Sequence, residues 1–237
     1  MRGAFPRLVI LRLRRSDPSV VWNRVNASHA DLDGGLHNSR NMFVKGLIFP
    51  GGREPVLEGD SLFLRYPEMG DYRQWSKLRE ESRDFLAPWE PAWASDELSR
   101  TAFRRRLRRY AREIRDDLAY PFLVFRTHDE VLLGGCTISN VRRGVTQCAA
   151  IGYWIGKPYA RQGCMFAALR ALLPFVFGTL ALHRVEAACI PENEASRNLL
   201  RKLSFREEGR ALRYLQINGE WRDHILFGLL QDESPWK

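Results

Sequence analysis

One continuous stretch, residues 151–169, most constrains how this chain can fold. It opens with an apolar, aromatic run that is typical of a strand, and Gly156 and Pro158 end that run. A turn around Gly163 follows, and the apolar periodicity of residues 166–177 then predicts a helix. A glycine turn in front of a helix can direct unpaired backbone N–H groups at a phosphate. The alternative is an ordinary strand–helix turn that binds no ligand.

Composition limits the broad class of protein. With 237 residues and 45% hydrophobic content, the chain can bury one sizeable core of roughly 150–200 residues. No run of about 18 apolar residues is present, so we predict no transmembrane helix and no membrane partner. The four cysteines have no C-x-x-C spacing, which argues against a metal site and favours reduced thiols in a cytoplasmic protein.

The N-terminal part of the chain differs from the rest. The formal net charge of the whole chain is +9, which favours anionic partners, although a solvated basic surface is the simpler explanation. Residues 1–41 carry seven arginines against three aspartates, with prolines that break any helix. We predict that 1–41 is a disordered or irregular basic extension, 42–55 a linker and 56–234 one domain. Such an extension is consistent with upstream sequence before a true start at Met42, and an organelle transit peptide is the alternative.

Hydrophobic periodicity predicts alternating strands and helices along the domain. A first strand is expected within Pro55–Met69, and Asp71 is the expected N-cap of a helix that runs to about Arg83. Two prolines make residues 85–93 a rigid aromatic loop, whose tryptophans either pack or wall a substrate cleft. Further strands are expected at 120–126, 131–141, 145–155, 184–190, 205–217 and 221–230, and further helices at 166–177 and 193–203.

A strongly basic helix is expected after the aromatic loop, with Ser95 as its N-cap. The expected buried stripe of this helix consists of Phe103, Leu107, Tyr110 and Ile114. Its basic residues are Arg100, Arg104, Arg105, Arg106, Arg108, Arg109, Arg112 and Arg115. A solubilising face is the general explanation for such arginines. The sharper hypothesis is a landing surface for an RNA-rich particle, with contact to rRNA through helix 100–115.

The order of these elements resembles the fold of the GCN5-related N-acetyltransferases (GNAT). Their RimJ-type branch, the ribosomal-protein alanine N-acetyltransferases, is similar in the closing hairpin. The resemblance covers about residues 54–231 and implies an α+β (α/β-like) fold, a mixed central sheet of about seven strands flanked by about four helices. The segments that carry it are 152–163 (GYWIGKPYARQG), 183–187, 193–209 and 214–224, with 79–83 and 88–91 in support.

The resemblance implies an acetyl-CoA-dependent enzyme that transfers acetyl to an amine by direct attack in a ternary complex. Backbone N–H groups at the helix N-terminus would hold the pyrophosphate, and a backbone N–H of the preceding strand would polarise the thioester carbonyl. The implied acetyl-CoA-binding residues are Tyr153, Trp154, Ile155, Arg161, Gln162, Gly163, Cys164, Met165 and Asn193.

Three residues are candidates for proton transfer. Ser196 matches a position where family members often have a hydroxyl that can protonate the leaving thiolate, and a simple first-turn serine is the alternative. Asn193 lies beside it and could equally be only an N-cap. Glu186 could act as a base if burial raised its pKa, but a structural ion pair with Arg184 competes with that role. His183 is a weaker candidate for the base.

The acceptor is expected to be the N-terminal α-amine of a protein, a ribosomal one with alanine or another small residue first. An α-amine has a pKa near ~7.7–8.0 and needs less help from a base than a lysine near ~10.4. The alternatives are a small-molecule amine acetyltransferase and a GNAT-fold protein that binds CoA weakly and docks on ribonucleoprotein. The candidates for acceptor binding are Trp89, Glu90, Trp93 and Tyr214.

The turn and a later helix end depart from the family pattern in ways that bear on cofactor affinity. Ala160 and Met165 occupy slots where the pattern has other residues, and Arg161 replaces a small residue. An arginine there could pair with a phosphate or could hinder backbone approach. Ser204 replaces a common glycine, at a cost of about 1 kcal/mol if its backbone is left-handed.

Overall fold

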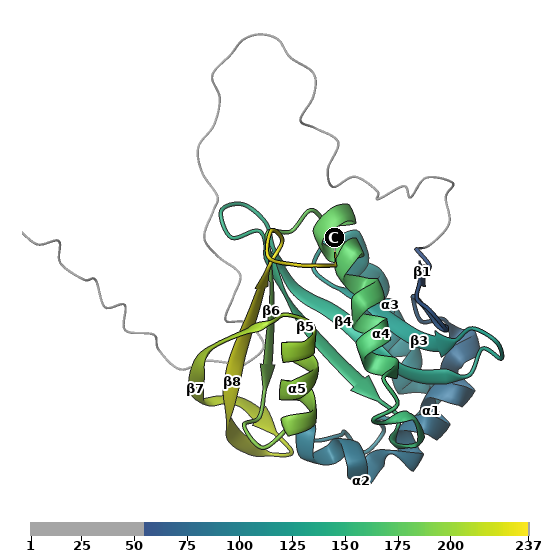
Figure 1. The fold of residues 1–237 in the computed structure, drawn as a ribbon. Helices are drawn as coiled ribbons and strands as arrows, with labels where there is room; N and C mark the ends of the chain where they lie inside the picture. Colours follow the sequence, from purple (N-terminus) through teal and green to yellow (C-terminus); the bar gives the residue numbers. More distant parts are fainter. Residues whose placement is uncertain (1–54, 237) are drawn as a thin grey trace, which may run out of the picture. The chain divides into compact units, whose positions relative to one another are not determined.

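The computed structural model describes residues 55–236, so the predictions for residues 1–54 lie outside the described residues. In this part of the chain an eight-stranded mixed sheet has the order β1-β2-β3-β4-β5-β6-β8-β7 (Figure 1). Its strands are β1 (Leu57–Glu58), β2 (Leu62–Arg65), β3 (Tyr120–Arg126), β4 (Leu132–Arg142), β5 (Cys148–Ile155), β6 (Arg184–Cys189), β7 (Arg206–Ile217) and β8 (Glu220–Leu230). The α-helices are α1 (Tyr72–Glu81), α2 (Arg83–Leu86), α3 (Arg100–Arg115), α4 (Cys164–Pro174) and α5 (Glu194–Lys202).

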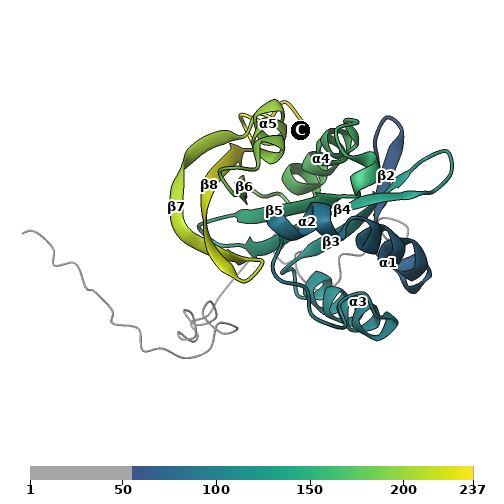
Figure 2. The ribbon, with the colours of Figure 1, turned by 90° about the horizontal axis from the view of Figure 1, so that it is seen from below.

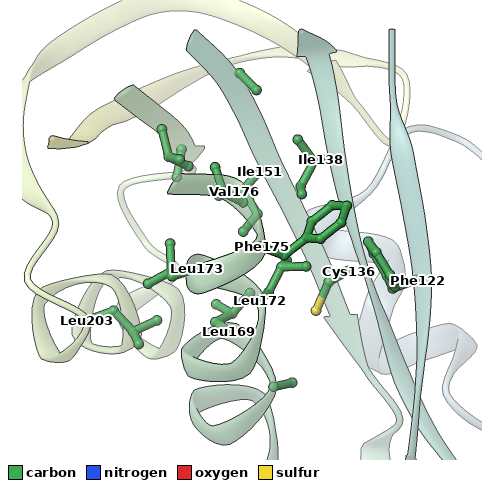
Figure 3. Packing of buried hydrophobic residues seen from close by; sticks show 14 of the residues in the cluster. Phe122, Cys136, Ile138, Ile151, Leu169, Leu172, Leu173, Phe175, Val176 and Leu203 are labelled. Atoms are coloured by element: carbon green, nitrogen blue, oxygen red, sulfur yellow. The ribbon is translucent and has the colours of Figure 1, made fainter. Parts of the chain in front are cut away.

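The helices cover the two faces of the sheet in separate groups. Figure 2 shows α4 and α5 on one side of the strands and α1 and α3 on the other. The larger core lies under α4 and α5, where Leu169, Leu172 and Phe175 pack against strand residues such as Phe122 and Ile138 (Figure 3). A smaller cluster around Trp75 and Phe103 joins α1 and α3 to the opposite face. Burial on both faces gives the central strands their nearly continuous apolar sequences.

The beginning of the domain differs from the prediction. The single strand expected within Pro55–Met69 is a hairpin of two short strands, β1 and β2, because the chain turns at Gly59–Ser61. Asp71 precedes α1, but its carboxylate makes no cap hydrogen bond to that helix. It accepts a hydrogen bond from the Glu68 N–H at 2.8 Å and pairs with Arg65 instead. These differences, with the short extra helix α2, account for eight strands and five α-helices within residues 55–236 rather than about seven strands and four helices.

The basic helix α3 begins later than the sequence predicts. Ser99, not Ser95, is its N-cap, and the Ser99 hydroxyl accepts a hydrogen bond from the Ala102 N–H at 3.0 Å. As a result Asp96 and Glu97 precede the helix, and their side chains pair with Arg105 and Arg106 within it. The predicted buried stripe is confirmed, since Phe103 is buried and Leu107, Tyr110 and Ile114 are partly buried.

The parallel strands β5 and β6 form a fork. They pair only over Cys148–Ala150 and Arg184–Glu186. Beyond that point β5 keeps its partner β4 and β6 keeps its partner β8, and Figure 1 shows the two arrows parting toward their tips. In the described part of the chain, no strand pairs with the inner edges of the fork. The fork therefore presents backbone N–H and C=O groups to whatever binds there.

None of the helices within residues 55–236 is long and apolar enough to cross a membrane. The same residues contain no group of three or more His, Cys, Asp or Glu side chains that could hold a metal ion.

Candidate active site

The turn between β5 and α4 has a backbone shaped for close approach by a ligand. Arg161 and Gly163 both have positive φ angles, of 61° and 80°. A Cβ atom placed on Gly163 would meet nothing within 4 Å, so the space beside this residue is open. α4 begins at the next residue, Cys164, and the first N–H groups of a helix have no partner within the helix. These groups and the helix dipole make the turn suited to a phosphate.

The departures from the family pattern in this turn do not close it. The Met165 side chain is buried, and its sulfur lies 3.5 Å from the Cys136 sulfur, so it points into the core. The Arg161 side chain is exposed, and the Gln162 amide donates to the Pro158 carbonyl at 2.7 Å, which braces the turn. The residues present therefore fit a diphosphate group held by backbone N–H groups, with Arg161 able to pair with it.

Side chains of β5 alternate between the two sides of the fork. Tyr153 and Ile155 pack with the core under α4 and α5, whereas Trp154 packs with the cluster under α1 and α3. The predicted cofactor residues of β5 are thus divided. Their side chains lie on opposite faces of the sheet, and only their backbone groups lie together along the inner edge of β5. A thioester bound in the fork would contact these backbone groups.

A pair of hydroxyl groups connects β5 with helix α5. The Tyr153 hydroxyl of β5 lies 2.7 Å from the Ser196 hydroxyl of α5, the helix that follows β6. Burial raises the pKa of Tyr153, and the hydrogen bond with Ser196 offsets only part of that rise. Tyr153 therefore keeps its proton at neutral pH. The pair can hold a proton at the fork and pass it on.

Asn193 orients the beginning of α5. Its side-chain oxygen accepts a hydrogen bond from the Ser196 N–H at 3.0 Å, which makes it the N-cap of this helix. This is the capping role that the sequence left open. The cap fixes the backbone of Ser196, and so contributes to the position of the Ser196 hydroxyl beside Tyr153.

The structure does not bring Glu186 together with these residues. Its carboxylate pairs with Arg142 at 2.7 Å and with Arg184 at 3.1 Å. On β6 it alternates with Val185 and Ala187, which are buried under α4 and α5, so it lies on the opposite face of the sheet from Ser196. The ion pairs favour the structural role that competed with the catalytic one. His183 is exposed and precedes β6, at the end away from the opening of the fork.

A buried carboxylate–guanidinium cluster holds the aromatic loop. Arg79 of α1 donates to both oxygens of Glu90 at 2.7 Å, and the Trp93 indole N–H donates to Glu90 at 2.8 Å. The Arg79 guanidinium lies 4.3 Å from the Trp93 ring centre and 4.9 Å from that of Trp154. The Glu90 carbonyl also accepts from the Asn218 N–H of the β7–β8 turn at 2.9 Å.

Two other predicted acceptor residues lie outside this cluster. Trp89 is 37% exposed, and Tyr214 on β7 is 48% exposed. Tyr214 contacts the ring of His224, which is buried on β8, with ring centres 5.7 Å apart. The cluster thus contains Glu90 and Trp93, and Trp89 and Tyr214 remain exposed beside solvent.

Comparison with known proteins identifies the family. The chain matches the acetyltransferase (GNAT) domain over residues 61–206. It belongs to the GNAT acetyltransferase family. The enzyme named [Ribosomal protein uS5]-alanine N-acetyltransferase from Escherichia coli (strain K12) is 34% identical over 173 residues, which span 73% of this chain and 89% of that protein. The predicted GNAT fold and acetyltransferase class are confirmed.

Solved structures agree with this assignment. Mycobacterium smegmatis RimJ in complex with CoA-disulfide has a TM-score of 0.70 and 35% identity, covering 77% of this chain and 87% of that one. The ribosomal-protein-S5-alanine acetyltransferase from Vibrio fischeri has a TM-score of 0.71 and 30% identity, covering 78% and 100%. The acetyltransferase described here is therefore similar to the RimJ-type branch in sequence and in structure.

Sequence reasoning missed two residues that shape the site of this acetyltransferase. Arg79 was part of a matching segment, but no role was inferred for it, although it organises the aromatic loop. Ser82 is fully buried, and its hydroxyl accepts a hydrogen bond from the Lys157 N–H at 2.9 Å, which anchors the chain just after β5. The Ser82 contact joins residues 75 apart in the chain, and the Arg79–Glu90 contact joins a helix to a loop 11 residues away. Neither spacing belongs to a helix or strand repeat, so periodicity does not predict these contacts.

Proposed function

We propose that this acetyltransferase transfers acetyl from acetyl-CoA to the N-terminal α-amine of a ribosomal protein that begins with alanine or another small residue. One observation carries the proposal: a single strand, β5, connects three features of the site. It forms one side of the β5–β6 fork, it leads into the left-handed turn at Gly163, and it carries Tyr153, which pairs with Ser196. The similarity to enzymes named for ribosomal-protein alanine acetylation supports the choice of acceptor. We place the reaction in the cytoplasm, where ribosomal proteins are made.

The cosubstrate binds along the opened edge of β5. The N–H groups of Arg161 to Met165 and the dipole of α4 hold its diphosphate, and the Arg161 guanidinium adds a charge-assisted contact. Acetyl-CoA supplies the activated thioester and a thiolate leaving group. An N–H on the inner edge of β5, at Trp154 or its neighbours, polarises the thioester carbonyl.

The hydroxyl pair serves the departing sulfur. Ser196 donates its proton to the departing thiolate, and the Tyr153 hydroxyl, 2.7 Å away, passes its proton to the Ser196 oxygen. The Tyr153 oxygen recovers a proton from the one that the amine nitrogen loses on acetylation, so both hydroxyls are restored. Because burial keeps Tyr153 protonated, the pair is ready to donate at neutral pH. Asn193 positions Ser196 through its backbone N–H and does not itself transfer a proton.

The acceptor amine approaches from the side of the aromatic loop. Trp89 and Tyr214, both exposed, form walls for the entering N-terminus, while Arg79, Glu90 and Trp93 keep the loop rigid. A useful fraction of α-amines near pKa ~7.7–8.0 is already neutral at pH 7, so the mechanism needs no strong base. We leave Glu186 out of the proton transfer because two arginines hold it on the other face.

Intact-mass measurement of ribosomal proteins tests the proposal directly. Proteins from cells with and without this enzyme are compared, and one protein is expected to gain the mass of a single acetyl group. Terminal fragmentation should place that group on the α-amine. An unchanged set of masses, or acetylation on lysine side chains only, would contradict the proposal. Calorimetric titration with acetyl-CoA then shows whether the protein is an acetyltransferase with a different acceptor or has no such activity. A protein that does not bind acetyl-CoA can acetylate neither a protein nor a small-molecule amine.

A further inference from the structure

Four arginines of α3 form a row with no acidic partner. Arg100, Arg104, Arg108 and Arg112 follow one another at intervals of four residues, and all four are exposed. Among the described residues, none of them forms an ion pair or a side-chain hydrogen bond. With a rise of about 1.5 Å per residue, neighbours in this row are about 6 Å apart and the row is about 18 Å long. We call these four residues the arginine row.

The other flank of the same helix is neutralised. Arg105 pairs with Asp96 at 2.7 Å, Arg106 pairs with Glu97, and Arg109 pairs with Glu113 at 3.5 Å. Arg106 also lies 5.0 Å from the ring centre of Trp75, so it takes part in packing. The four arginines of the row are therefore unpaired, whereas those of the other flank are paired, as is Arg115 in the last turn, which pairs with Asp116 at 3.1 Å. A purely solubilising surface gives no reason for this division.

The arginine row also works against its own helix. Like charges spaced by four residues repel one another on a helix surface. Arg100 is the first residue of α3, and the first turn contains no acidic residue, so a cation lies at the positive end of the helix dipole. The row therefore lowers the stability of helix α3, and an anionic partner bound to the row would offset that loss.

We propose that the arginine row binds the phosphate backbone of RNA beside the acceptor protein. Over about 18 Å one strand of a double helix presents roughly five phosphates, which suits four evenly spaced guanidinium groups. The residues beside the row, Thr101 and Ala111, are exposed and small. A protein partner would need apolar or aromatic anchors that this flank lacks.

The arginine row lies on the side of the sheet that α1 covers, which would suit an acceptor protein that is bound to RNA. α3 lies on the sheet face opposite α4 and α5, so it is away from the helix that begins at the phosphate turn (Figure 2). It packs against α1 through Phe103 and Trp75, with ring centres 4.8 Å apart, and α1 provides the Arg79 that holds the aromatic loop. RNA on the row would therefore lie on the acceptor side. This consequence rests on the proposed function, whereas RNA binding itself does not.

A pair of matched variants tests the row. Arg104→Gln with Arg108→Gln removes two unpaired arginines, and Arg105→Gln with Arg109→Gln removes two paired ones from the same helix with the same change of charge. Binding of the full chain to a fluorescently labelled RNA hairpin is measured by anisotropy across a salt series. The wild-type slope of log K against log salt is expected near −3, and the first variant should lose roughly half of it. The second should keep most of the slope and bind within about threefold of wild type.

Three outcomes would overturn the proposal: binding that does not depend on salt, equal losses in the two variants, or competition by poly-glutamate as strong as that by unlabelled RNA. Acetylation of a free N-terminal peptide is followed in the same variants and should stay at the wild-type rate, because the row does not touch the site. If the wild type fails to acetylate any peptide, the proposed function fails. The RNA measurement then still decides the role of the row.

Discussion

The two sides of the candidate site are built in different ways. The proposed cosubstrate side, at the Gly163 turn and the β5–β6 fork, consists mainly of backbone groups within residues 153–165. The proposed acceptor side consists of side chains from separate elements, with Arg79 on α1, Glu90 in the loop after α2 and Trp154 on β5. Backbone geometry can bind a constant group such as a diphosphate. Assembled side chains can change with the acceptor while the cosubstrate side stays the same.

The largest effect should come from the backbone of the cosubstrate side. Gly163→Val places a β-branched residue at φ 80° and fills the space where the diphosphate approaches, so acetyl-CoA affinity should fall by at least about 100-fold. Calorimetric titration measures the loss. Gly144→Val is the matched control, because Gly144 also has a positive φ and open surroundings but precedes β5 at its other end. Equal loss in both variants would mean that strain, not ligand contact, explains the effect.

The hydroxyl pair should matter for turnover and not for binding. Ser196→Ala is expected to lower kcat by about 100-fold while the acetyl-CoA dissociation constant stays near that of wild type. Tyr153→Phe should also lower kcat, and the double variant should be little worse than Ser196→Ala, because the two hydroxyls act as a unit. Steady-state kinetics and titration measure both quantities. Independent, multiplying losses would show that the two hydroxyls do not share one proton path.

The acceptor side should respond through stability and acceptor affinity. Glu90→Gln leaves the buried Arg79 guanidinium without its counter-charge, and we expect a loss of about 2 kcal/mol in the free energy of unfolding. The KM for the peptide should rise while acetyl-CoA binding is unchanged. Glu80→Gln, which breaks an exposed pair with Arg83, is the control and should leave the free energy of unfolding nearly unchanged. A weakened acetyl-CoA affinity in Glu90→Gln would mean that the two sides are not separate.

The smallest effect concerns pH and His224, beside Tyr214. Burial lowers the pKa of His224, so the folded protein binds this proton less readily than the unfolded chain. Its neutral form therefore contributes stability above about pH 6.5, which is lost as the pH falls through the lower folded pKa. His224→Gln should flatten the fall in the free energy of unfolding between pH 7 and 5, measured by urea titration, by less than about 1 kcal/mol. A steeper fall in the variant would contradict the sign of this shift.

The elements that the sequence predicted well are those with a complete local signal. β3 has the predicted bounds, and the strand, turn and helix around Gly163 lie within a few residues of the prediction. Ser204, predicted to be strained if left-handed, has a φ of 68°. The errors fall where several local signals compete. Ser95 and Ser99 are both good caps, and only the folded structure shows that the Ser99 hydroxyl accepts the capping hydrogen bond, from the Ala102 N–H.

The sequence by itself determined the order of strands and helices that is typical of the GNAT fold, the glycine turn before α4 and the place of Ser196 in the first turn of a helix, because each has a signal in residues close together in the chain. Only the tertiary structure decided that Ser196 meets Tyr153, that Glu186 is held by arginines on the other face, and that Arg79 organises the aromatic loop. It also separated the unpaired arginines of α3 from the paired ones. These contacts depend on packing between distant segments, which local propensity and periodicity do not encode.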